Sequence, residues 1–308
     1  MRVVKLLSVG LSGTTQDIRE RLQLDCKTLI KDGYRIAIDE TNKGHYTFIG
    51  CNVMEGELSF RNYERIKNAV KHHVANMLAE LIISREEKKI VYKIVEDNYY
   101  YFSAEERKII YDNTLQLLND NYGVVADFGF GTRSKNIVEK IAEYLNAHHE
   151  LVLEGFINFR LKEYREKLAR VVDTAVDDFM MELEYQEFIR VLRYFVTIQE
   201  PQVEEVHVVI INSGTYKILD EQGNLISNQK LENFVLENDD SINHEDLLIT
   251  ALITIAPYSV MVHVEDHNRA TTKSLVDIIK NIFDGRFMIC NGCDFCMNAY
   301  KEDLMPTH

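Results

Sequence analysis

The chain has 308 residues, of which 46% are hydrophobic and 27% are charged, and it contains three prolines. This composition excludes a disordered chain and supplies enough apolar residues for about two domains. No apolar run approaches the roughly 18 residues of a membrane-spanning helix, and the net charge of −14 argues against general binding to nucleic acid.

Residues 1–58 predict a small α/β unit. Val3–Val9 is a short apolar run typical of a strand, and Thr14–Lys31 has the apolar spacing of a helix. Two β-rich runs follow, Tyr34–Asp39 and Tyr46–Val53, with a turn signal between them. The order is therefore βαββ. The first apolar run is too short for a signal peptide, so we expect the protein to stay in the cytoplasm.

Residues 59–200 predict a helical body. Apolar residues recur at three-and-four spacing from about residue 60, which is typical of amphipathic helices. Ser103 and Glu106 have the outline of a capping box, which predicts a helix start. A further helix is expected from Ser134 to about His148.

The longest predicted helical stretch is Phe156–Glu200, which contains neither glycine nor proline. Its apolar stripe slips between Leu183 and Phe188, which predicts two helices or one bend at that point. Cations concentrate at its start and carboxylates in its middle. This pattern is typical of a solvated helix face, and a surface for a protein partner or for nucleic acid is the alternative.

Residues 201–308 predict a second α/β domain, because the hydrophobic period changes after Pro201. A βαβ unit closes this domain, and its crossover makes the last two strands parallel. The whole chain is thus expected to be a mixed α/β protein. The predicted elements are strands at Val206–Ile211, Val260–Val264 and Arg286–Cys290, a hairpin at Gly214–Ile226, and helices at Leu247–Ala256 and Thr272–Phe283.

Seven segments of the helical stretch and the later domain form a recognisable pattern. They are Phe159–Tyr164, Val172–Asp177, Met181–Phe188, Leu192–Val196, Gln199–Pro201, Val206–Val209 and Thr254–Pro257. In this pattern the chain resembles the YtxC-like family of sporulation proteins from endospore-forming Firmicutes. The resemblance is strong over about residues 155–211 and extends in layout to about residue 290. It implies a cytoplasmic, sporulation-associated protein, and it implies no activity, substrate or catalytic residue.

The sharpest candidate site is the cluster Cys290, Cys293 and Cys296. Gly292 permits the tight turn that points neighbouring thiolates at one ion. Thiolates suit zinc or an iron–sulfur cluster, and both usually take four ligands. A reactive redox pair and a terminus without special role are the alternatives.

The remaining metal ligand is expected from the neighbouring strand. Parallel strands end at the same edge of a sheet, so His263, Asp266 or His267 would approach the cysteines. We select His267 for the predicted metal site, and His308 is a further candidate.

Two glycine-containing segments, Gly10–Thr15 and Asp127–Lys135, precede predicted helices and would expose N–H groups to an anion. Neither has the Lys-Ser/Thr ending of a P-loop, and an ordinary turn is the alternative. The adjacent pairs His72-His73 and His148-His149 make poor chelates, because neighbouring helical residues do not face each other. Tyr99–Phe102 is interpreted as packing, since no basic cluster surrounds it.

Three functional hypotheses follow. The first is a non-catalytic interaction or regulatory protein with an unidentified protein partner, because no catalytic signature occurs in the sequence. The second is a metal- or thiol-dependent sensor that uses the cysteine cluster. The third is an enzyme acting on a phosphate-containing substrate through one of the glycine segments.

Overall fold

The computed structural model shows two compact units, Met1–Met180 and Met181–His308, each with its own hydrophobic core. Among the helices in the described ranges, none combines the length and hydropathy that crossing a bilayer requires. The structure describes residues 3–12, 19–20, 36–54, 60–120, 128–210, 216–226, 244–264 and 270–293.

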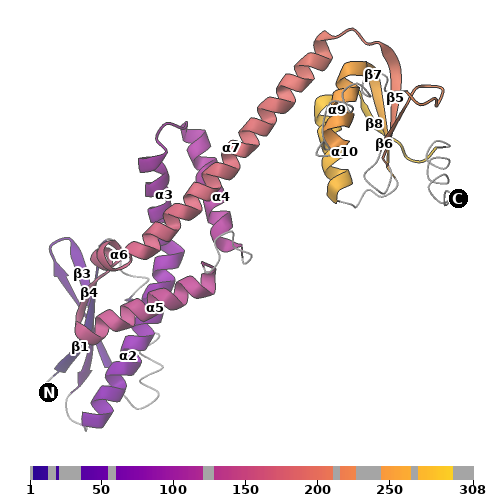
Figure 1. Ribbon diagram of the computed structural model, residues 1–308. Coiled ribbons are helices and arrows are strands. Elements are labelled where there is room, and N and C mark those ends of the chain that lie inside the picture. The colour runs from indigo at the N-terminus through magenta and orange to yellow at the C-terminus, as the bar shows by residue number, and fades with distance from the viewer. Residues whose placement is uncertain are drawn as a thin grey trace. The chain divides into compact units, whose positions relative to one another are not determined.

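The first unit contains a four-stranded sheet in the order β2-β3-β1-β4 (Figure 1). β1 (Val3–Ser12) pairs antiparallel with β3 (Tyr46–Met54), which pairs in turn with β2 (Ile36–Lys43). These strands confirm the predicted ones. The sequence did not predict β4 (Glu150–Val152), which pairs parallel with β1. The helix predicted at Thr14–Lys31 lies almost wholly outside the described residues.

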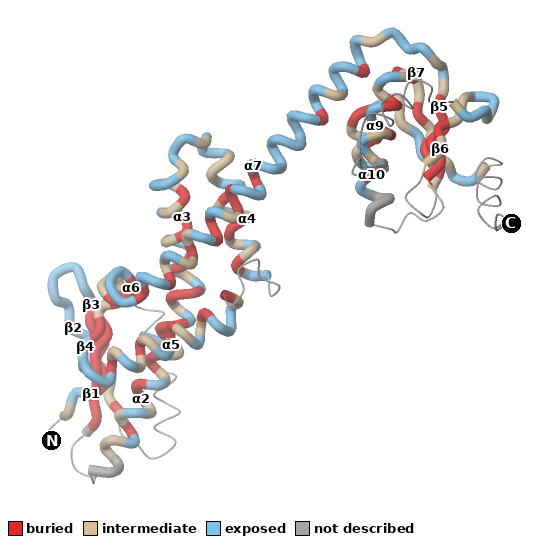
Figure 2. The backbone as a smooth tube through the Cα atoms, viewed as in Figure 1, coloured by how far each residue is buried: buried red, intermediate tan, exposed pale blue. Residues whose placement is uncertain are grey.

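Helices form the rest of the first unit and bury one face each. α5 packs against α2, and apolar residues of all these helices join those of β1 and β3 in one core (Figure 2). The predicted capping box is confirmed: Ser103 accepts a hydrogen bond from the Glu106 N–H, and Glu106 accepts one from the Ser103 N–H. The helices are α2 (Phe60–Leu81), the π-helical turn η1 (Ile82–Glu86), α3 (Glu87–Asn98), α4 (Ala104–Asn119) and α5 (Phe130–Ala147).

The long helical stretch breaks at a different place from the one predicted. α6 (Leu153–Arg160) ends at Leu161, whose φ of −102° and ψ of 32° leave the helical region. α7 (Lys162–Ile198) then runs without interruption through residues 183–188. The alternative of two separate helices meeting there was wrong, and the slip of the apolar stripe marks a change of core. α7 contributes to the first core up to Phe179 and to the second core from Ile189 onward, and residues 180–188 are exposed.

The second unit is built on a sheet of order β6-β5-β7-β8. β5 (Val203–Ile210), β7 (Pro257–Val264) and β8 (Phe287–Ile289) are parallel, and β6 (Tyr216–Leu219) pairs antiparallel with β5. The predicted parallel βαβ unit is therefore confirmed.

Two helices lie on the same side of this sheet, α9 (His244–Ile255) and α10 (Ala270–Ile282) (Figure 1). α10 connects the parallel strands β7 and β8, whereas α9 follows β6 in the chain and leads into β7. Val206, Val208, Val260 and Val262 point into the core that these helices cover. Because side chains alternate along a strand, His207 and His263 point to the opposite face.

A buried ion pair ties the helices of the first unit together. Arg133 of α5 is 1% exposed, and its Nε lies 3.3 Å from Glu87 Oε2, an ion-pair distance without hydrogen-bond geometry. Its Nη1 donates to the carbonyls of Leu118 and Phe128 at 2.8 and 3.1 Å. Tyr164 of α7 donates to the same Glu87 oxygen. Burial raises the pKa of Glu87, while Tyr164 and Arg133 oppose the rise.

Candidate metal centre

The end of β7 and the segment after β8 bring His263, Cys290 and Cys293 together. The two strands are parallel and in register at Val262 and Ile289. The N–H of Cys290 extends this pairing by donating to the Val262 carbonyl at 2.9 Å. His263 is the next residue on β7, so its side chain lies at the same sheet edge as the thiol of Cys290.

Gly292 returns the chain toward this edge so that Cys293 joins the cluster. Its φ of +117° lies in the region that L side chains rarely adopt, which explains a glycine at this position. Its N–H donates to Cys290 Sγ at 3.3 Å, a contact that stabilises a thiolate. The predicted tight turn between the two cysteines is present.

The three potential ligand atoms lie close enough together to contact one ion, and one pair of them has the spacing of a tetrahedral zinc site. They all lie within 4.8 Å of one another, and His263 Nδ1 is 3.5 Å from Cys293 Sγ. Zn–S and Zn–N bonds in a tetrahedron place a nitrogen and a sulfur about 3.6 Å apart, and two sulfurs about 3.8 Å apart. The observed distance between His263 Nδ1 and Cys293 Sγ matches the expected nitrogen–sulfur distance.

His263 is also prepared electrostatically to act as a ligand. It is wholly buried, and burial, followed by the neighbouring His207, lowers the pKa of His263 to about 4. The ring is therefore neutral at pH 7, as a metal-binding imidazole must be. Its other nitrogen, Nε2, lies 3.0 Å from His207 Nδ1.

The predicted ligands divide into those that the structure brings together and those that it does not describe. Cys290 and Cys293 meet, and the histidine that joins them is His263. Cys296 and His267 lie outside the described residues, as do Asp266 and His308. Within the described part of the chain, this is the one group of three potential metal ligands.

His207 is a site residue that the sequence analysis missed. A signal was available: Val206-His207-Val208 and Val262-His263-Val264 are matching Val-His-Val triplets on strands predicted for one domain. Their parallel pairing places Val209 opposite His263, so His207 and His263 are diagonal neighbours on one face of the sheet.

Neither glycine segment presents the predicted anion site in the described residues. Gly10 lies inside β1, where a Cβ would lie 2.6 Å from the Phe48 ring, so close packing explains this glycine. Ser12 ends the strand, and its N–H and hydroxyl both donate to the Glu154 carboxylate at 2.9 and 2.5 Å. The anion held there is a side chain of the protein itself.

In the second segment, Asp127–Lys135, the cation Arg133 pairs with a carboxylate of the protein itself. α5 begins at Phe130, earlier than predicted, and Gly131 lies in its first turn. Arg133 is buried against Glu87, while Lys135 is exposed and 4.0 Å from Glu139. The chemistry at this turn is therefore that of a structural ion pair.

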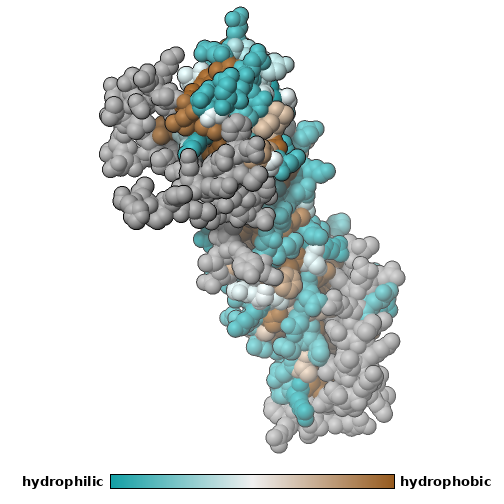
Figure 3. Space-filling model, turned by 90° about the vertical axis from the view of Figure 1, so that its right-hand side faces the viewer, coloured by the Kyte–Doolittle hydropathy of each residue, from teal (hydrophilic) through white to brown (hydrophobic). Residues whose placement is uncertain are grey.

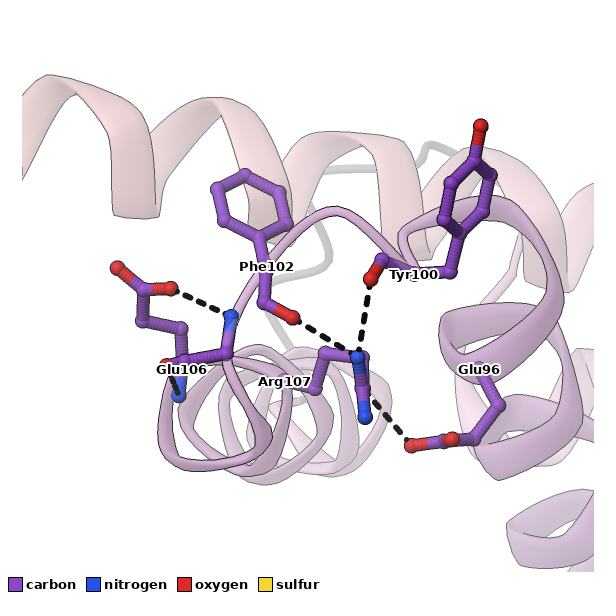
Figure 4. A network of polar contacts seen from close by, with 6 residues as sticks. Glu96, Tyr100, Phe102, Glu106 and Arg107 are labelled. Atoms are coloured by element: carbon purple, nitrogen blue, oxygen red, sulfur yellow. Dashed lines mark hydrogen bonds and ion pairs between the residues drawn. The ribbon is translucent and has the colours of Figure 1, made fainter.

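The tyrosine-rich turn between α3 and α4 is held by one arginine (Figure 4). Arg107 donates to the carbonyls of Tyr100 and Phe102 and pairs with Glu96 at 2.9 Å. Tyr101 and Phe102 pack with their ring centroids 4.6 Å apart and their planes tilted by 38°, as the packing interpretation of this segment expects. Tyr100 is nevertheless 74% exposed.

Fold and site together define a mixed α/β protein of two units, with a cysteine–histidine cluster at the edge of the second sheet. The chain belongs to the YtxC-like family, whose model matches residues 72–288. This match contains His207 and His263 and ends before Cys290.

One curated relative resembles the chain over most of its length. The chain is 24% identical over 227 residues to the uncharacterized protein YtxC of Bacillus subtilis strain 168, covering 70% of this chain and 76% of that protein. No solved structure matches the chain.

Proposed function

We propose that this protein is a non-catalytic regulatory protein of sporulation that acts in the cytoplasm, and that a zinc ion organises its second unit. Cys290, Cys293 and His263 would hold the ion, with the fourth position taken by Cys296, by His267 or by a group supplied from outside. The observation that carries the proposal is the convergence of the three ligand atoms within 4.8 Å, with His263 Nδ1 and Cys293 Sγ at the separation expected for two ligands of one zinc ion.

The donor set favours a single zinc ion over an iron–sulfur cluster. An iron–sulfur cluster usually takes four thiolates. Here two thiols and one imidazole lie within 4.8 Å, which suits one borderline-soft ion that accepts both sulfur and nitrogen. In a reducing cytoplasm, thiols that are grouped in this way favour metal binding over a structural disulfide.

Charge and surface composition support a role in cation binding and partner recognition. Residues 181–308 carry 21 Asp and Glu against 9 Lys and Arg, whereas residues 1–180 carry 28 against 26. The negative potential of the second unit therefore concentrates cations near the cluster. The same unit exposes apolar side chains of α7, because Phe188, Val191, Phe195 and Ile198 are 42–57% exposed. On the face drawn in Figure 3, apolar surface lies beside hydrophilic surface.

The metal content of the purified protein tests the zinc centre. Protein prepared without chelator or metal-affinity resin is expected to contain about one zinc per chain, measured by elemental analysis. Cys293→Ser should lose this zinc, because it removes one ligand. Cys51→Ala is the matched control, since Cys51 is a buried thiol of β3 in the other unit.

The proposal fails if folded wild-type protein is metal-free and takes up no zinc on titration. A Cys290–Cys293 disulfide in the freshly isolated protein would favour the redox alternative instead. Equal zinc in wild type and Cys293→Ser would place any bound ion elsewhere.

The regulatory role is tested in the spore-forming host of this gene. A strain carrying the Cys293→Ser allele is expected to form heat-resistant spores at the reduced frequency of a deletion strain, because the second unit loses its organising ion. The Cys51→Ala allele should sporulate like wild type. A deletion without effect on sporulation would contradict the proposed role, whatever the zinc content of the protein.

A further inference from the structure

The two nitrogens of His263 face different neighbours. Nδ1 lies 3.5 Å from Cys293 Sγ, on the side of the thiols, while Nε2 lies 3.0 Å from His207 Nδ1. A neutral imidazole carries one proton, on one of its two nitrogens. Which nitrogen of His263 carries it decides whether the lone pair of Nδ1 points toward the thiols.

The contact between the histidines has two possible directions. His263 can donate from Nε2 to His207 Nδ1, which leaves its own Nδ1 as a lone pair facing Cys293. In the reverse direction, His207 donates from Nδ1, and His263 then carries its proton on Nδ1 and donates it to the sulfur. The first arrangement is competent to bind metal, and the second is not.

Glu205 favours one of these two directions of the hydrogen bond. Its Oε1 lies 3.6 Å from the outer nitrogen of His207, Nε2. A carboxylate is only an acceptor, so it favours a proton on that nitrogen. With the proton on Nε2, the Nδ1 of His207 carries the lone pair that faces His263, and the hydrogen of the contact then comes from Nε2 of His263.

We propose that Glu205, through His207, holds His263 in the tautomer that binds metal, with Nδ1 as the ligand atom. This inference rests on the zinc centre proposed above. Strand geometry supports it: His207 and His263 lie on adjacent parallel strands, and the flanking valines fix the opposite face in the core. The ring centroids are 5.2 Å apart, and both rings are buried. His207 is thus a positioning residue that acts through His263.

Zinc affinity of four variants tests the inference, measured by competition with a chromophoric chelator. His207→Leu removes the acceptor at similar volume and is expected to weaken zinc binding about 10- to 100-fold. His207→Asn keeps an acceptor near the position of Nδ1 and should restore most of the affinity. Glu205→Gln should weaken binding by a smaller factor, because a partly exposed carboxylate acts more weakly. Glu204→Gln, its exposed neighbour on β5, should bind like wild type.

Proton position is measured directly by long-range ¹H–¹⁵N NMR of the histidine rings. In wild-type protein, with and without zinc, His263 is expected to carry its proton on Nε2. A proton on Nδ1 in the zinc-free protein would overturn the inference even if the variants fail to fold.

The outcomes separate this inference from the proposed function. If wild-type protein binds no zinc, both the zinc centre and the role of Glu205 and His207 are overturned. If wild-type protein binds zinc no more tightly than folded His207→Leu, only the role of Glu205 and His207 is overturned. Weaker zinc binding in His207→Leu together with recovered binding in His207→Asn supports both proposals.

Discussion

Replacing Arg133 by methionine is expected to destabilise the first unit by about 3–5 kcal/mol at pH 7, measured by denaturant unfolding. Methionine fills much of the volume of the arginine, but it leaves the buried Glu87 carboxylate without its cation. It also removes the donor to the carbonyls of Leu118 and Phe128. Lys135→Met, two residues along the same helix and exposed, should change stability by less than about 0.5 kcal/mol.

The pH dependence of this loss identifies its cause. A carboxyl group whose folded-state pKa is raised keeps its proton in the folded state while the unfolded chain loses it. Stability therefore falls as the pH rises above the ordinary pKa of the group, which for Glu87 is 4.5. Without Arg133 this fall becomes larger. The difference between wild type and Arg133→Met should thus shrink as the pH is lowered toward 4.5.

Adding Glu87→Gln to the variant should recover part of the lost stability at pH 7, because a neutral amide needs no cation. A penalty that is independent of pH, with no recovery in the double variant, would show that packing, rather than the buried charge, dominates.

Removing zinc with a strong chelator is expected to destabilise the second unit and leave the first unchanged. A ligand at a thousandfold excess over its dissociation constant stabilises the folded state by about 4 kcal/mol. The two cores share no residue among those described, so the loss should be local. Amide hydrogen exchange should accelerate in β7 and β8 and stay constant in α2 and α5.

Cys293→Ser is the control for this experiment, since it should exchange rapidly in β8 with or without chelator. Equal acceleration in both units, or none in β7 and β8 of protein that had contained zinc, would contradict a centre that organises the second unit.

Much of the fold could be predicted from the sequence, because local patterns carry most of its elements. Alternating and continuous apolar runs predicted β5, β7 and β8, and the crossover rule predicted that they are parallel. β4 was not predictable in this way, since Glu150–Val152 is too short to show a period and exists through its pairing with β1. The slip of the α7 stripe was visible, but its cause, a change of core, needs tertiary structure.

The candidate site also combines features that the sequence could predict with features that only the tertiary structure reveals. The cysteine spacing and the shared sheet edge were readable from the sequence, and they pointed to the cluster that the structure forms. The choice among His263, Asp266 and His267 depends on where β7 ends and on which face each side chain occupies. The burial of Arg133 is likewise a tertiary fact, because its sequence context resembles that of an anion-binding turn.

The parallel pairing of β4 with β1 sets an order for folding during synthesis. β1 forms its antiparallel partner contacts with β3 within the first 54 residues, but its other edge is covered by residues 150–152. Until the ribosome has released that segment, β1 presents an open edge with Leu7, Val9 and Leu11 beside it. The nascent chain therefore carries an aggregation-prone strand edge through about a hundred residues of elongation, and the sheet closes only after residues 150–152 have been made.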